Sequence, residues 1–272
     1  MNTEPNPEQL KAYLSESLAW AQIIGQVATG GFRSSQARRK EDGSLVTLMD
    51  ERADRMFVEF IQQAFPSHVV LSEEQETRYD PQQEYTWVVD PIDGTTNFAR
   101  GLPIWGISVA LLWYGMPVVG VVDFPLLHET FSAAKGLGAH RNGEVIQSGS
   151  EKRAATQQLI MTCTRSPKRY RLQTTLKPRT LGSAAYHLVK VADGAALASL
   201  EATPKLWDIA APFVILTEAG ALLTSVDGSP VFPLPDRAID YQTCSISCLT
   251  AASPELHSHL LSNLTLVSQE LP

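Results

Sequence analysis

The sequence predicts an α+β fold in which sheets and helices pack in layers. Apolar residues recur every three or four positions over 10–27 and 53–64, which is the periodicity of amphipathic helices. Two apolar, β-branched runs, 104–113 and 116–124, are joined by Tyr114-Gly115, which is typical of a β-hairpin. Because hairpins interrupt the alternation of strands and helices, the pattern favours mixed layers over a doubly wound parallel sheet.

The first half of the chain is expected to contain two long helices followed by a set of strands. The first helix begins after Pro7 and ends near Gly30, and the second covers 50–65, just before Pro66. The segment 78–83 is expected to be a loop. Strands are predicted at 68–71, 87–89, 104–113, 116–124, 129–134 and 138–141, with a short helical stretch at about 95–99 and a tight turn at Asn142-Gly143.

The second half continues with strands and helices after a polar segment of small residues at 149–156. We interpret that segment as the boundary between an N-terminal half, 1–149, and a C-terminal half, 150–272, which together make one catalytic unit. Strands are predicted at 159–163, 196–200, 222–225 and 246–250, and helices at 183–193, 208–219 and 254–261.

Composition excludes several classes of function. The chain has 272 residues and a formal net charge of −7, and its one basic run is Arg38–Lys40, which argues against a nucleic-acid partner. No apolar run reaches the ~18 residues that a membrane span needs. The N-terminus lacks the basic-then-apolar pattern of a secretory signal. We therefore expect a cytoplasmic protein with no membrane partner.

The segment Tyr85–Phe98 (YTWVVDPIDGTTNF) has the strongest functional pattern. An apolar strand ends in Asp90 and Asp93, which can present two carboxylates and the Ile92 carbonyl to one side, the ligands that Mg²⁺ prefers. If a helix starts after Gly94, the amides of residues 94–96 form an anion site. The residues alone leave a structural alternative open, in which Asp93 caps that helix and Asp90 merely ends the strand.

Three separated motifs resemble those of the inositol monophosphatase family. They are Asp90–Phe98, Ser72-Glu73-Glu74, and Leu206–Ala211 (LWDIAA) far downstream. The resemblance runs from Lys40 to about Val231. It implies an αβαβα sandwich, a lithium-sensitive phosphomonoesterase with about two or three Mg²⁺ ions, and a homodimer.

The same resemblance implies which residues bind metal. The ligands would be the carboxylates of Glu73, Asp90, Asp93 and Asp208 and the carbonyl of Ile92. We expect these four carboxylates to surround a small space with no cationic side chain among them. Without the resemblance, Glu73 would be interpreted as solvated loop charge and Asp208 as a helix N-cap.

Further residues are implied in catalysis and substrate binding. Glu73 and Thr95 would activate a water molecule, and Asp50 would orient Thr95, although Asp50 alone looks like a helix N-cap. Lys40 is a weaker candidate on a neighbouring loop. Substrate contacts are expected from Gly94, Thr95, Thr96, Gly182, Ser183, Ala184, Glu201 and Asp208. The alternatives are that Glu201 is exposed at a strand end and that Gly182-Ser183 is an ordinary helix start.

The expected reaction is hydrolysis of a small phosphate monoester by a metal-activated water, with inositol monophosphate as the first candidate. Because the six scattered histidines are interpreted as structural, no covalent intermediate is expected. Histidinol phosphate, fructose 1,6-bisphosphate and 3′-phosphoadenosine nucleotides are alternative substrates, since Ala202–Lys205 departs from the commonest relatives. A different class is a regulatory binding protein that uses the same fold, for example on the transcription machinery.

Overall fold

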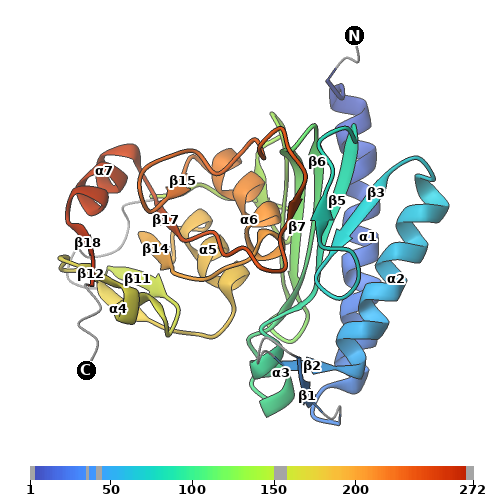
Figure 1. Cartoon of the computed structure of the whole chain (residues 1–272), viewed down its shortest axis with the longest axis horizontal. Helices are drawn as coiled ribbons and strands as arrows, with labels where there is room; N and C mark the ends of the chain where they lie inside the picture. Colours follow the sequence, from blue (N-terminus) through green and yellow to red (C-terminus); the bar gives the residue numbers. More distant parts are fainter. Residues whose placement is uncertain (1–3, 35–36, 41–44, 150–157, 268–272) are drawn as a thin grey trace.

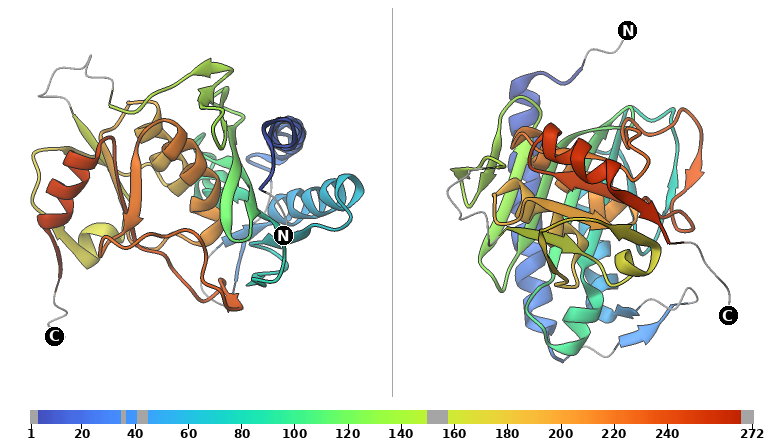
Figure 2. Two further views of the ribbon diagram at one scale, coloured as in Figure 1. Left: turned by 90° about the horizontal axis from the view of Figure 1, so that it is seen from above. Right: turned by 90° about the vertical axis from the view of Figure 1, so that its left-hand side faces the viewer.

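The computed structural model describes residues 4–34, 37–40, 45–149 and 158–267, which form five alternating layers of helix and sheet (Figure 1). Helices α1 (Pro7–Gly31) and α2 (Leu48–Ala64) make one outer layer, and both contact the seven-stranded sheet. Figure 2 shows these two helices on the same face of that sheet. Helices α5 (Ala184–Ala192) and α6 (Leu206–Glu218) fill the middle layer. A five-stranded sheet follows, and α7 (Pro254–Ser262) covers its outer face, so the predicted αβαβα sandwich is confirmed.

The seven-stranded sheet carries most of the N-terminal strands. Its order is β10-β9-β8-β7-β6-β5-β3; β3 and β5 are parallel and the other neighbours are antiparallel. The predicted hairpin joins β6 to β7 through Tyr114 and Gly115, which both have positive φ. The bounds are β3 Val69–Ser72, β5 Tyr85–Asp93, β6 Gly106–Trp113, β7 Met116–Phe124, β8 Glu129–Ala134, β9 Ala139–Arg141 and β10 Glu144–Val145.

The five-stranded sheet is built from the C-terminal half in the order β13-β11-β14-β17-β15. Its strands are β11 Leu159–Thr162, β13 Lys177–Arg179, β14 Ala198–Glu201, β15 Leu222–Ser225 and β17 Cys248–Ala251. The remaining elements are short. Three strand pairs are β1 (Ala37–Arg39) with β2 (Leu45–Thr47), β4 (Arg78–Tyr79) with β16 (Ile239–Asp240), and β12 (Tyr170–Leu172) with β18 (Leu264–Leu266). Two short helices are α3 (Thr95–Arg100) and α4 (Ser166–Arg169).

The structure corrects two local predictions. The expected loop at 78–83 begins with β4, because Arg78-Tyr79 pairs with a strand about 160 residues downstream that sequence periodicity cannot reveal. Helix α2 begins at Leu48 and not at Asp50. Thr47 is the N-cap, and the Asp50 carboxylate accepts a hydrogen bond from the Thr47 amide in a capping box. The predicted boundary at 149–156 lies, apart from Gly149, outside the described residues and stays a prediction.

Close packing in the middle layer brings the C-terminal half against the end of β5. At Gly120 of β7 an added Cβ would lie 2.4 Å from the carbonyl oxygen of Ala211 in α6, so only glycine allows this approach. Helix α6 contacts β5, β6 and β7, while α5 packs between α6 and β14. The N-terminal ends of α5 and α6 are thereby directed toward Asp93. Of the helices in the described ranges, none combines the length and apolar character needed to cross a membrane.

Candidate active site

The end of β5 is built to present carboxylates. Its pairing with β6 is irregular between Asp90 and Asp93, both of which are buried, and the Ile92 amide donates to Asp90 Oδ1 at 3.0 Å. Gly94 then takes φ +92°, and α3 begins at the next residue. A side chain at Gly94 would also meet the Ile104 carbonyl at 3.1 Å. The strand, glycine and helix expected from the sequence are therefore present in that order.

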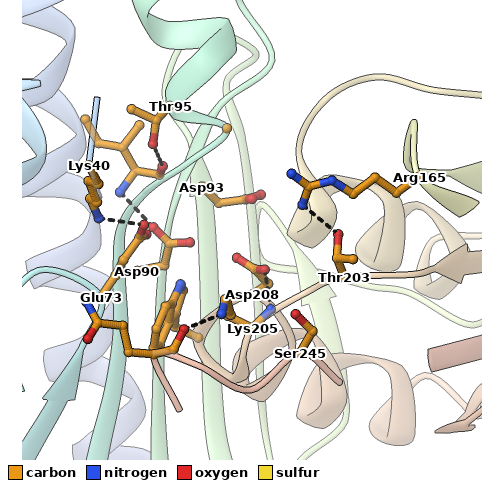
Figure 3. Close-up of a pocket in the computed structure, with 14 residues that line it drawn as sticks. Lys40, Glu73, Asp90, Asp93, Thr95, Arg165, Thr203, Lys205, Asp208 and Ser245 are labelled. Atoms are coloured by element: carbon orange, nitrogen blue, oxygen red, sulfur yellow. Dashed lines mark hydrogen bonds and ion pairs between the residues drawn. The ribbon is translucent and has the colours of Figure 1, made fainter. Parts of the chain in front are cut away.

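Three carboxylates meet at this point (Figure 3). Oxygen atoms of Asp90, Asp93 and Asp208 all lie within 4.8 Å of one another. Asp208 arrives on the first turn of α6, where it accepts a hydrogen bond from the Lys205 amide at 2.7 Å. Lys205 is the N-cap of α6, so the alternative of Asp208 as N-cap is wrong.

Burial and mutual repulsion make this cluster costly to ionise. Burial is the largest cause that raises the pKa of Asp90 well above its ordinary value, and the Glu73 and Asp208 charges add to it. Burial, with Asp93 nearby, raises the pKa of Asp208 to about 7. Buried carboxylate oxygens that repel one another fit a hard divalent cation, which would neutralise them.

Glu73 lines the same cavity, of about 380 Å³, as the three aspartates. Lys40 Nζ lies 3.0 Å from Glu73 Oε1 and 2.5 Å from Glu74 Oε1. The expectation that no cationic side chain lies among the carboxylates is therefore wrong. Burial alone would lower the pKa of Lys40, but the two glutamates raise it above its ordinary value. Burial raises the pKa of Glu73 to about 7, while Lys40 opposes that shift.

Asp50 contacts Thr95, as the resemblance implies. Thr95 Oγ1 lies 3.1 Å from both Asp50 Oδ1 and the Ile92 carbonyl oxygen, each of which can accept its proton. The other Asp50 oxygen accepts hydrogen bonds from the Thr47 amide at 2.8 Å and the Thr47 hydroxyl at 2.5 Å. The capping box of α2 therefore holds Asp50 against the turn that contains Thr95.

The residues predicted to contact substrate at the start of α5 also hold Asp93. The Ser183 hydroxyl and the amides of Ala184 (3.2 Å) and Ala185 (3.0 Å) donate to its carboxylate. Burial raises the pKa of Asp93, and these three hydrogen bonds oppose the shift. Gly182, Ser183 and Ala184 line a second cavity of about 600 Å³, so their position agrees with a substrate contact as well.

The second cavity adjoins the first, since Asp93 and Asp208 line both. Thr96 and Glu201 also line it. Glu201 is 1% exposed, so the alternative of an exposed strand end is wrong. Burial raises its pKa to about 8.

Sequence reasoning missed several residues that line these cavities. His187 was interpreted as structural, yet it lines the second cavity, and its place one helical turn after Ser183 was the available signal. Arg165 lines both cavities and donates to Thr203 Oγ1 at 3.2 Å (Figure 3). The Lys205 side chain lines the first cavity and donates to the Gln242 carbonyl. No sequence pattern marked Arg165.

The five layers and the carboxylate cluster place the chain among layered αβαβα sandwich proteins with a site that could hold a metal ion. The chain belongs to the inositol monophosphatase family, whose family model matches residues 9–266.

The relatives to which the chain is similar are named for different functions. The chain is 31% identical over 228 residues to "Nus factor SuhB" of Pasteurella multocida, covering 79% of this chain and 85% of that protein. It is 32% identical over 239 residues to "Fructose-1,6-bisphosphatase/inositol-1-monophosphatase" of Aquifex aeolicus, covering 82% and 89%. The solved structure of an IMPase from Thermotoga maritima superimposes with a TM-score of 0.78 at 28% identity, covering 92% of this chain and 96% of that one.

Proposed function

We propose that this chain hydrolyses the phosphate monoester of a small polyol, with inositol monophosphate as the first substrate to test. The observation that carries the proposal is the meeting of Asp90, Asp93 and Asp208 within 4.8 Å, with Glu73 on the wall of the same cavity. The glycine turn at Gly94 lies beside them. The names of the Aquifex and Thermotoga relatives support an inositol phosphate.

We assign cation binding to the carboxylates of Glu73, Asp90, Asp93 and Asp208, with the Ile92 carbonyl between the two residues from β5. Bound Mg²⁺, in about two or three copies, would offset the charge of the ester and lower the pKa of a water molecule. The raised pKa values of Asp90 and Asp208 support this assignment, because a bound cation would favour the ionised form of both groups.

The attacking water is assigned to Glu73 and Thr95. Asp50 and the Ile92 carbonyl compete for the Thr95 proton, so the lone pairs of Thr95 Oγ1 are left to accept from a water molecule. The amides of Gly94, Thr95 and Thr96 would hold oxygens of the phosphate at the start of α3. Water would then attack in line, with the protein forming no covalent bond to phosphorus.

A panel of phosphate esters, assayed with and without Mg²⁺ and Li⁺, tests the proposal. We expect Mg²⁺-dependent turnover that Li⁺ inhibits and that Asp90→Asn abolishes while circular dichroism stays that of the wild type. Asp236→Asn is the matched control, because Asp236 is exposed and lies outside both cavities. Near-normal turnover by Asp90→Asn would reject the assignment.

The absence of a covalent intermediate is tested separately with an ester that is chiral at phosphorus. Direct attack by water inverts the configuration once. Net retention would require two displacements, and therefore a phosphoenzyme.

A second candidate is a substrate that carries a second negative charge. Arg165 and Lys205 both line the cavity that contains the carboxylates, and the Arg165 fork has donors beyond the one that binds Thr203. The Aquifex relative is named for a bisphosphate as well as for inositol phosphate. Fructose 1,6-bisphosphate therefore belongs in the panel, with histidinol phosphate and 3′-phosphoadenosine nucleotides. A loss of bisphosphate turnover alone in Arg165→Gln would favour this candidate.

A regulatory binding role is the third candidate, and the Pasteurella relative's name supports it. No turnover on any ester of the panel would favour it. The homodimer and the cytoplasmic location stay predictions. Light scattering would test the first, and cell fractionation the second.

A further inference from the structure

His187 lies on the inner face of α5 with both ring nitrogens in hydrogen bonds. The ring is 1% exposed. The Leu181 amide donates to Nε2 at 2.8 Å, so that nitrogen must be the unprotonated one. In the neutral ring Nδ1 therefore carries the proton, and it donates to Glu201 Oε1 at 2.7 Å. The backbone thereby selects one tautomer of His187, and that tautomer points its proton at Glu201.

Glu201 is held from two sides by these contacts. Its Oε1 accepts from His187 Nδ1 and from the Ser199 hydroxyl at 3.2 Å. Both of these hydrogen bonds use Oε1, so a ligand group would meet Oε2. The Cys163 thiol is a further hydrogen-bond partner of the Glu201 carboxyl group. Since Glu201 lines the second cavity, that ligand would lie next to the carboxylates of the first.

Helix α5 links this contact to the candidate metal site. Its N-cap, Ser183, donates to Asp93, and the His187 amide donates to the Ser183 carbonyl at 3.2 Å, one turn further on. The segment before the helix is anchored to α3, because Asn97 Nδ2 donates to the Leu181 carbonyl at 2.7 Å. One short helix therefore sets the spacing between Asp93 and Glu201.

We propose that His187 is a positioning residue for substrate choice. It turns Glu201 so that Oε2 forms a hydrogen bond with a hydroxyl of the leaving group, which favours polyol phosphates over esters without hydroxyls. The inference rests on the proposed phosphatase function for the reaction itself. A carboxyl group held in one orientation rejects an ester without the matching hydroxyl, because its oxygen then stays buried and unpaired.

Two conservative variants separate this role from simple filling of the core. His187→Asn retains a donor near the position of Nδ1 and so can still bind Glu201. His187→Gln reaches the position of Nε2, where it can accept from Leu181 but loses the donor to Glu201. Kinetics are measured with inositol 1-phosphate and with p-nitrophenyl phosphate, which has no hydroxyl.

We expect His187→Gln to lower the ratio of kcat/KM for inositol 1-phosphate to that for p-nitrophenyl phosphate at least tenfold, mainly through KM. His187→Asn should keep the ratio within about threefold of the wild type. Ser199→Ala should lower it in the same direction by less, and it tests the inference even if the His187 variants fold poorly. Equal losses for both esters, or an unchanged ratio in His187→Gln, would overturn the inference.

The tautomer gives a test that is independent of activity. The ¹⁵N chemical shifts of the neutral His187 ring in the wild-type protein should report a protonated Nδ1. A protonated Nε2 would overturn the inference even if the enzyme is active. If the wild type hydrolyses neither ester with Mg²⁺, the proposed function fails first, and the inference fails with it.

Discussion

Gly182→Ala tests the contact that joins α3 to the segment before α5, both of which contribute to the candidate site. Gly182 has φ +87°, and an added Cβ would lie 2.7 Å from Asn97 Nδ2. That amide group donates to the carbonyls of Ile104 and Leu181 at 2.6 and 2.7 Å. Alanine at this position therefore strains the backbone and displaces a side chain that ties α3 to the segment before α5.

The cost can be worked from these contacts. A non-glycine residue in the left-handed region costs about 1–2 kcal/mol. Loss of the two hydrogen bonds that Asn97 donates adds roughly 0.5–1.5 kcal/mol for each bond. We expect a loss of about 2–5 kcal/mol in the free energy of unfolding, which lowers Tm by roughly 4–9 °C in a chain of this size.

Thermal unfolding and urea titration, with and without Mg²⁺, measure this loss. Gly30→Ala is the matched control, because Gly30 lies in helix α1 and an added Cβ meets nothing within 4 Å. That variant should be stabilised by about 0.5–1 kcal/mol. A Tm for Gly182→Ala within about 1 °C of the wild type would refute the reasoning.

Three further predictions concern charge at the site. In EDTA the free energy of unfolding should fall as pH rises from about 4 to about 7. The reason is that Glu73 and Asp208, whose pKa values are raised to about 7 from 4.5 and 3.8, bind more protons in the folded state than in the unfolded state. Mg²⁺ should reduce this pH dependence, and urea titrations measure it. Lys40→Gln removes the cation that pairs with Glu73, so calorimetry should show Mg²⁺ binding about fivefold tighter, which corresponds to about 1 kcal/mol. Ser183→Ala removes the N-cap of α5 and its bond to Asp93, which should cost about 1–2 kcal/mol in stability and also weaken Mg²⁺ binding.

Matched variants separate the site effects from general ones. Lys11→Gln removes an exposed lysine in α1 and should leave Mg²⁺ binding unchanged. Ser253→Ala removes the N-cap of α7, so it should cost similar stability without any effect on Mg²⁺. Stability that is flat or rising between pH 4 and 7 in EDTA would contradict the first prediction. Weaker Mg²⁺ binding by Lys40→Gln would contradict the second, and unchanged binding by Ser183→Ala the third.

Local chemistry made much of the site predictable from the sequence. Asp90, Asp93 and Gly94 occupy one strand-to-helix turn, where glycine is needed for its positive φ, so their spacing determines their arrangement. The hairpin at Tyr114-Gly115 and the helical periodicity of α1 are equally local. The family motifs added Glu73 and Asp208, which no local pattern places near Asp90.

Tertiary structure decided how the separate segments meet. Glu201 and Asp208 lie more than 100 residues beyond Asp90, and the packing of α5 and α6 between two sheets brings both toward the end of β5, with Glu201 buried and Asp208 half-buried. The ion pair of Lys40 with Glu73 and the hydrogen bond of His187 with Glu201 join different elements. Local periodicity carries no information about such pairs, because their energy comes from contacts that exist only once the layers have packed. The sequence alone therefore determined the turn that contains Asp90, Asp93 and Gly94. The tertiary structure decided which charged groups and hydrogen-bond donors surround that turn.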